Sequence, residues 1–294
     1  MVLPSGVPES LKPAVDPLAS VDPSQLAKMR LSPAAERWHK PVFILFLLAW
    51  AVNWVLLLLR VQLPAEARWL EALLPVLAAA TSLLALGRRL PFQNVFVAAV
   101  VILGLSTAIV AVGALSGVPF GPVVYSDDFA ERLFAVVPWP LPLLWVALVI
   151  NGRGVARLIM RPWRKTNFYG YWVIGLACLL AVLFDLGLEP FAVQVKGWWI
   201  WLSGKSVLSW HTAPWVNCLG WFITAMSILA LSIPWLINKQ PVKQPIDYHP
   251  LVVWLLLNLW VATGNAVANL WLAVGVCLAG NMVAAIYAVR GARW

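Results

Sequence analysis

Charged residues are scarce in this sequence. Only 11% of its 294 residues are Asp, Glu, Lys or Arg, whereas 62% are hydrophobic. An ordinary soluble domain carries roughly 25% charged residues, because a packed core needs a polar shell around it. The composition therefore excludes a soluble globular protein.

Cysteine and histidine are also few, and neither shows a metal or redox pattern. The thiols lie inside apolar runs, where cysteine acts as a small hydrophobe: Cys178, Cys218 and Cys277. The histidines are far apart at the ends of segments: His39, His211 and His249. No spacing of His, Cys or carboxylates resembles a metal site. The sequence therefore predicts neither a metal ion nor a cofactor.

Nucleotide-binding loops are missing as well. The string SGKS at 203–206 resembles the end of a phosphate loop, but the required glycine five positions before Gly204 is Trp199. The glycines of NGRGVAR at 151–157 lack a third member and follow no predicted strand. Nucleotide hydrolysis is therefore not expected.

Long apolar runs fill most of the chain. Runs of about 20 residues match a hydrocarbon layer roughly 30 Å thick, and they do not alternate as transmembrane β-strands would. The sequence predicts an all-α, polytopic transmembrane bundle with seven or eight spans. The stretch 250–289 is expected to form either two short spans or one span and a surface helix. Six other spans are predicted at residues 41–59, 69–86, 95–115, 133–151, 169–187 and 214–237. Residues 41–294 form this domain, and the Pro-rich residues 1–40 are predicted to be a disordered cytoplasmic tail.

The basic charge has a topological explanation. With the N-terminus inside, cytoplasmic segments collect sixteen of the 21 Lys and Arg residues, as the positive-inside rule requires. Two crossings in the last stretch keep Arg290 and Arg293 inside, so eight spans are favoured. The net charge of +9 then needs no nucleic acid, although the basic run 151–165 could attract anionic lipid head groups.

Tryptophan is abundant, with nineteen residues. Many lie near predicted interfaces, where an aromatic belt is expected. Trp198, Trp199 and Trp201 cluster in an outer loop. They are either interfacial anchors, the favoured interpretation, or aromatic walls for a long apolar ligand.

Acidic residues gather near the predicted outer side: Glu71, Asp127, Asp128, Glu131, Asp185 and Glu189. A carboxylate within apolar sequence is costly and indicates function. Asp185 and Glu189 share one helix face if the fifth span continues. Two carboxylates in a dry site cannot both ionise easily, and a protonated acid beside an ionised partner suits proton transfer. The structural alternative is that both reach the interface or pair with Arg132 or Lys196.

Two further stretches contain proline, glycine and polar residues that constrain the local backbone. PFGPVVYSDD at 119–128 indicates a rigid turn. HTAPWVNCLGW at 211–221 begins the sixth span, with Pro214 where proline is tolerated. It places Asn217 and Trp221 on one helix face, and Asn217 is expected to meet a polar partner from another helix.

These stretches carry a resemblance. GVPFGPVVYSD at 117–127 matches a Gly-x-Pro-Phe/Tyr-Gly-x-Tyr-type loop, and DLGLEP at 185–190 matches Asp-x-x-x-Asp-Pro with Glu189 as the second acid. APWVNCLGW at 213–221 matches Pro-Leu-x-Asn-Phe-x-Gly-Trp. Over residues 40–240 the chain resembles the carotenoid-biosynthesis membrane family, whose characterised members are CruF-type carotenoid 1,2-hydratases. Two valines before Tyr125 and the basic run depart from that pattern, which leaves a different substrate or a non-catalytic role open.

The resemblance implies cofactor-independent hydration of the terminal double bond of an acyclic carotenoid. An acid protonates the alkene, and water attacks the tertiary cation. The catalytic residues that we predict for this chemistry are Asp185 as the acid or its partner, Glu189 and Asp127 beside it, and Tyr125, which with Asn217 orients water or the acid. The implied substrate-binding residues are Phe120, Trp215, Asn217, Trp221 and Glu71.

Three other functions stay open: a carotenoid end-group cyclase, a non-catalytic carotenoid-binding subunit and a small-molecule transporter. No inverted repeat is visible to favour the transporter. The expected partners are a carotenoid or other long isoprenoid and membrane lipid, with no nucleic acid; association with other pigment-related membrane proteins is left open. The expected location is the bacterial cytoplasmic (inner) membrane.

Overall fold

A computed structural model describes residues 33–61, 63–127, 129–202, 208–237 and 246–294. Most of the predicted tail, together with Asp128 and the SGKS string, lies outside the described residues. The predicted domain division at residue 40 therefore stays a prediction.

Eight helices in the described part of the chain are long and apolar enough to cross a membrane. The chain is thus an integral membrane protein, and the predicted polytopic bundle is confirmed with eight spans. Their bounds are α2 Pro33–Leu58, α3 Trp69–Gly87, α4 Phe92–Ser116, α5 Pro140–Ile159, α6 Tyr169–Pro190, α7 Val216–Leu236, α8 His249–Val267 and α9 Trp271–Ala292. Short helical turns add η2 Ala65–Ala67, η3 Arg161–Trp163 and η4 Phe191–Val195, the last continuing α6 as a π-helix.

The last apolar stretch forms two helices, α8 and α9. The polar run at 263–265 does not break it, because these residues lie inside α8. The break falls at Asn269, which has a φ of 61°, a left-handed conformation that asparagine tolerates better than most residues. Asn269 therefore allows the chain to turn between the two helices, and the Leu270 N–H closes the turn on the Asn265 carbonyl.

The predicted fourth span, 133–151, was placed too early. Residues Arg132–Leu133 and Val137–Pro138 form a two-stranded hairpin, β2 with β3. The helix begins at Pro140 because proline fits the first helical turn but not the interior. It then continues to Ile159 through the basic run that was expected to be a cytoplasmic loop. Arg153 is buried there and donates from Nη2 to the Leu236 carbonyl at the end of α7, 2.8 Å away.

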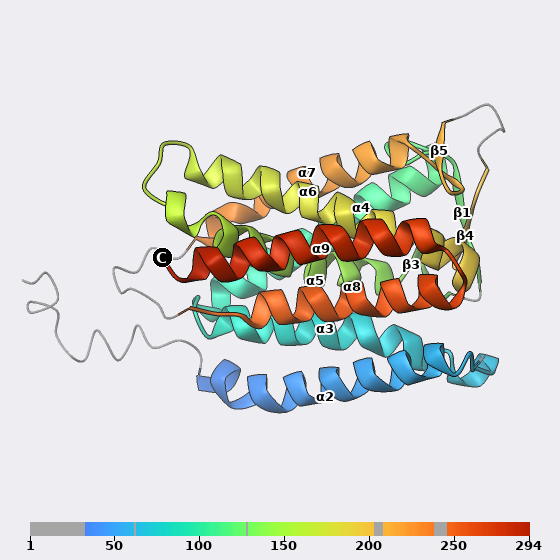
Figure 1. The fold of residues 1–294 in the computed structure, drawn as a ribbon, viewed down its shortest axis with the longest axis horizontal. Coiled ribbons are helices and arrows are strands. Elements are labelled where there is room, and N and C mark those ends of the chain that lie inside the picture. The colour runs from blue at the N-terminus through green and yellow to red at the C-terminus, as the bar shows by residue number, and fades with distance from the viewer. Residues whose placement is uncertain (1–32, 62, 128, 203–207, 238–245) are drawn as a thin grey trace, which may run out of the picture.

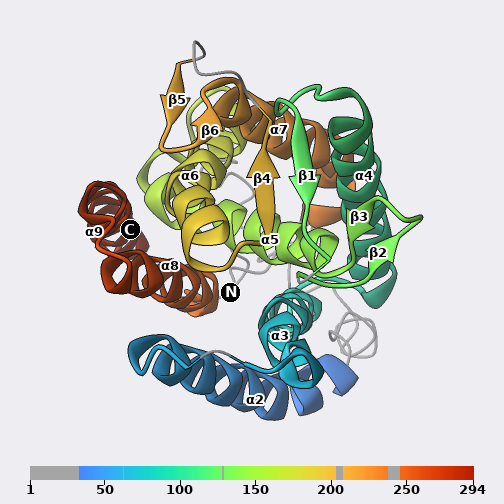
Figure 2. The same cartoon turned by 90° about the vertical axis from the view of Figure 1, so that its right-hand side faces the viewer.

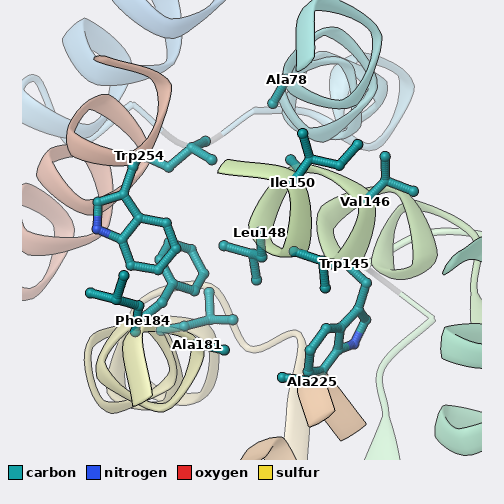
Figure 3. Packing of buried hydrophobic residues seen from close by; sticks show 14 of the residues in the cluster. Ala78, Trp145, Val146, Leu148, Ile150, Ala181, Phe184, Ala225 and Trp254 are labelled. Atoms are coloured by element: carbon teal, nitrogen blue, oxygen red, sulfur yellow. The ribbon is translucent and has the colours of Figure 1, made fainter. Parts of the chain in front are cut away.

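Helix α5 is the central element of the bundle. In the most apolar 18-residue segment of α5, 72% of the residues are buried, compared with 17% in the same kind of segment of α2 and 28% in that of α9. Figure 3 shows side chains of α5 meeting those of α3, α6, α7 and α8 in the apolar core. The labelled residues are Ala78, Trp145, Val146, Leu148, Ile150, Ala181, Phe184, Ala225 and Trp254. Because other helices cover α5, a cavity that borders α5 is separated from lipid on the α5 side.

Among the described residues, three short antiparallel ribbons lie at one end of the bundle, and the C-terminus lies at the other end (Figure 1). Strand β1 Val123–Tyr125 pairs with β4 Trp199–Trp201, and β5 Ser209–Trp210 pairs with β6 Ala213–Pro214. Figure 2 looks onto this end and shows β1 and β4 lying across the ends of α4, α5, α6 and α7. The ribbons cap the bundle there.

The orientation of the bundle in the membrane stays a prediction from charge. Basic residues cluster at the end of the bundle that carries the C-terminus: Arg88, Arg89, Arg157, Arg161, Arg164, Lys165, Arg290 and Arg293. We expect a green fluorescent protein fused to the C-terminus to fluoresce and alkaline phosphatase fused there to be inactive. Fusions in the turn between α8 and α9 should behave in the opposite way, and matching behaviour at both points would contradict the predicted topology.

Candidate functional site

Two carboxylates occupy the ribbon end of α6. Asp185 and Glu189 lie one turn apart and are 1% and 3% exposed. Helix α6 continues past Asp185 to Pro190, so Asp185 and Glu189 lie on one face of the helix, as predicted. The ion-pair alternative is wrong, because Arg132 pairs with Asp127 at 2.5 Å and Lys196 pairs with Glu71 at 2.6 Å. Both acids are also too buried to be reaching for the interface.

Asn217 of α7 joins the two acids. Its Nδ2 donates to Asp185 Oδ2 at 2.8 Å and to Glu189 Oε1 at 3.1 Å. Asn217 is itself 2% exposed, so the expectation of a polar partner on another helix is confirmed. Asp185 Oδ1 is buried and has no hydrogen-bond partner among the described residues. The shared amide holds both carboxyls in one dry cluster.

Strand β4 supplies two more donors to Glu189. The indole Nε1 groups of Trp199 and Trp201 donate to Glu189 Oε2 at 3.1 and 2.9 Å. Both rings reach the same carboxylate because alternate strand residues point to one face. The favoured anchor interpretation is therefore wrong for these two residues, which are turned inward. Trp198 is 7% exposed and stacks on Phe129 at 4.5 Å, so it too is part of the interior.

A cavity of about 30 Å³ borders Glu189, which is room for a water molecule. Four helices (α4, α5, α6 and α7), the β1–β4 ribbon and the connection before β1 form its walls. The lining residues are Val110, Phe120, Val123, Tyr125, Leu141, Trp145, Glu189, Trp199, Trp201, Asn217 and Trp221. Six of them are aromatic, and Trp145 stacks on Trp221 with ring centroids 4.5 Å apart. One carboxyl thus faces a pocket walled mainly by π-faces.

Tyr125 adds a hydroxyl to this wall. Its ring meets Trp199 edge-on at 6.0 Å, across the β1–β4 ribbon. Burial raises the pKa of Tyr125 well above its usual value, and the charge of Glu189 raises it further. The phenol therefore keeps its proton and can donate a hydrogen bond to water beside Glu189.

The structure brings six predicted site residues together at this cluster and cavity: Phe120, Tyr125, Asp185, Glu189, Asn217 and Trp221. Three others lie elsewhere. The side chain of Asp127 is 94% exposed, and Trp215 is 43% exposed at the start of α7. Glu71 lines a second cavity of about 20 Å³ that Trp198 also lines.

Sequence analysis missed the two indole donors and Trp145. A signal for the donors was present, because aromatic and β-branched residues such as those of WIW at 199–201 favour a strand, and alternate residues of a strand share one face. Their partner strand lies far away in sequence, in the connection that follows α4. Local sequence patterns therefore could not predict that these two rings contact Glu189.

The family model described as "Carotenoid biosynthesis protein" matches residues 68–288. The chain belongs to this family. The matched range includes every residue of the cluster and cavity, and it confirms the resemblance drawn from the three motifs.

One curated relative in this comparison is the bisanhydrobacterioruberin hydratase of Haloarcula japonica. It is 31% identical over 121 residues, which cover 40% of this chain and 38% of the relative. The alignment thus spans less than half of either protein. No solved structure matches the chain.

Proposed function

We propose that this family member adds water to the terminal double bond of an acyclic carotenoid without a cofactor. The observation that carries the proposal is the buried Asp185–Asn217–Glu189 cluster beside an aromatic cavity. The family description and the name of the Haloarcula relative support a carotenoid role, and that relative acts as a hydratase. The membrane-embedded bundle suits a polyene dissolved in the bilayer.

The first step is proton transfer to the alkene. Two carboxyls in a dry site hold one proton between them more readily than none, and Glu189 is the one that borders the cavity. The proton passes from the pair, through Glu189, to the terminal double bond and leaves a tertiary carbocation. The π-faces of Trp145, Trp221 and Trp199 surround this cation and stabilise it.

The second step is water addition. A water oxygen attacks the tertiary cation, and the resulting oxonium gives its extra proton back to the Glu189 carboxylate. Three N–H donors hold that carboxylate in place: Asn217, Trp199 and Trp201. The net change is one water added across one double bond, and the pair regains its proton. Tyr125 orients the attacking water.

The experiment is expression of the chain in a bacterium that makes lycopene, an acyclic carotene. We expect pigments heavier by one or two waters in mass spectra, because lycopene has two equivalent ends. An isomer of unchanged mass would support end-group cyclisation instead, since the same cation then loses a proton. Unchanged lycopene that co-purifies with the protein would support a binding subunit. We expect the chain in the cytoplasmic membrane fraction of this host.

A further inference from the structure

The catalytic cavity has no open path to lipid on most sides. The β1–β4 ribbon covers its outer end, and α5, the most buried helix, forms its inner wall. Helices α4 and α7 are different, because their other faces are exposed. Val112 and Leu115 of α4 are 54% and 76% exposed, and Leu219 of α7 is 56% exposed. The way from the bilayer to Glu189 therefore runs between α4 and α7, which lie next to each other in Figure 2.

The side chain of Phe120 blocks this path between α4 and α7. The ring of Phe120 lies between a glycine on each helix: a Cβ at Gly113 of α4 would be 2.6 Å from its Cδ2, and a Cβ at Gly220 of α7 would be 2.6 Å from its Cδ1. Real Cβ atoms do not approach other atoms so closely. The two glycines face opposite edges of the ring, so they form a slot that holds the width of one aromatic ring. Phe120 also lines the cavity.

Phe120 is carried by a short connection and not by a helix. Gly117 and Gly121 flank it with φ values of 76° and 106°, conformations that favour glycine. Val118, within the same connection, is 65% exposed. Movement of the ring out of the slot is therefore a movement of this connection, whose backbone packs against α7 at Gly220.

We infer that Phe120 is the gate through which an isoprenoid end reaches Glu189 from the bilayer, and that the Gly113–Gly220 slot selects a narrow, acyclic end over a wider ring that carries methyl groups. The inference rests on the proposed function, because it takes a polyene as the substrate. It explains how a cavity with room for water serves a long substrate: only the chain end enters, and it takes the place of the Phe120 ring.

The test uses the full chain in lipid nanodiscs with two probes, lycopene and the bicyclic β-carotene. Wild-type hydration of lycopene should not respond to β-carotene. In Phe120→Ala the slot is open, so about a tenfold excess of β-carotene should slow the reaction about tenfold, as a competitor of equal affinity does. Phe134→Ala, an exposed phenylalanine on the β2–β3 hairpin, is the matched control and should behave as wild type. An active Phe120→Ala that ignores β-carotene would overturn the gate.

A second variant separates gating from general packing. The three atoms nearest to a new Cβ at Gly113 all belong to the Phe120 ring. Gly113→Ala should therefore change KM for lycopene about threefold or more in the wild type and leave KM unchanged in the Phe120→Ala background, which is the non-additivity of residues in contact. Equal effects in both backgrounds would contradict the inference.

Pigment retention keeps the two proposals distinguishable. If no hydration occurs in any variant, the proposed function fails. Wild type should then still retain lycopene and exclude β-carotene, and Phe120→Ala should retain both. If Phe120→Ala excludes β-carotene as wild type does, the gate fails whatever the chemistry.

Discussion

Replacement of Glu189 by glutamine is expected to lower hydration by about 10²–10⁴-fold, the usual contribution of a positioned general acid. Glutamine keeps the size of the side chain and an oxygen to accept an indole N–H, but it has no acidic proton to give to the alkene. Asp185→Asn should have an effect of the same order, because the remaining carboxyl then loses the partner that shares its proton. The measurement is the fraction of hydrated pigment per molecule of membrane-inserted protein.

Glu131→Gln is the matched control. Glu131 is an exposed acid at the same end of the bundle, so the same chemical change there should leave hydration within about twofold of wild type, as for most surface substitutions. Insertion and folding are checked by size-exclusion chromatography of each variant. Full activity in a folded Glu189→Gln protein would remove this residue from the mechanism.

The residues that sequence analysis placed correctly are those whose relation is local. Asp185 and Glu189 share a face, as do Asn217 and Trp221, because a four-residue spacing on a helix fixes that relation. The high cost of a polar group among apolar residues also predicts that such groups meet each other. These rules predicted a polar partner for Asn217 on another helix, but they did not predict that one amide would donate to both carboxyls.

The residues placed wrongly are governed by non-local pairing. Asp127 is close in sequence to Tyr125, yet the strand ends between them, and Asp127 turns out to solvent and pairs with Arg132. The fourth span was misplaced because apolar residues at 133–137 belong to a hairpin, and hydropathy does not distinguish a capping ribbon from a helix start. The inward turn of Trp199 depends on the β1–β4 pairing, which joins segments separated by α5 and α6.

Replacement of Asn217 by leucine is the other change with a large expected effect. Leucine has a similar size but no N–H, so Asp185 loses its hydrogen-bond partner among the described residues and Glu189 loses one of three donors. A hydrogen bond to a charged group is worth about 1.5–3 kcal/mol, so loss of this positioning should slow hydration about 10–100-fold. The variant should also unfold at a lower temperature, because two buried carboxyls become less well solvated.

Asn281→Leu separates these two consequences. Asn281 of α9 is also buried and also makes several hydrogen bonds: it accepts from Trp254 Nε1 at 2.7 Å and donates to Asn258 Oδ1 at 2.9 Å. Its network does not include Asp185 or Glu189, so its loss should lower the unfolding temperature while hydration per folded molecule stays near the wild-type rate. If both variants lose activity in proportion to stability, Asn217 only holds α6 against α7. If Asn217→Leu alone loses activity beyond its stability loss, the amide sets the geometry in which the acid pair delivers its proton.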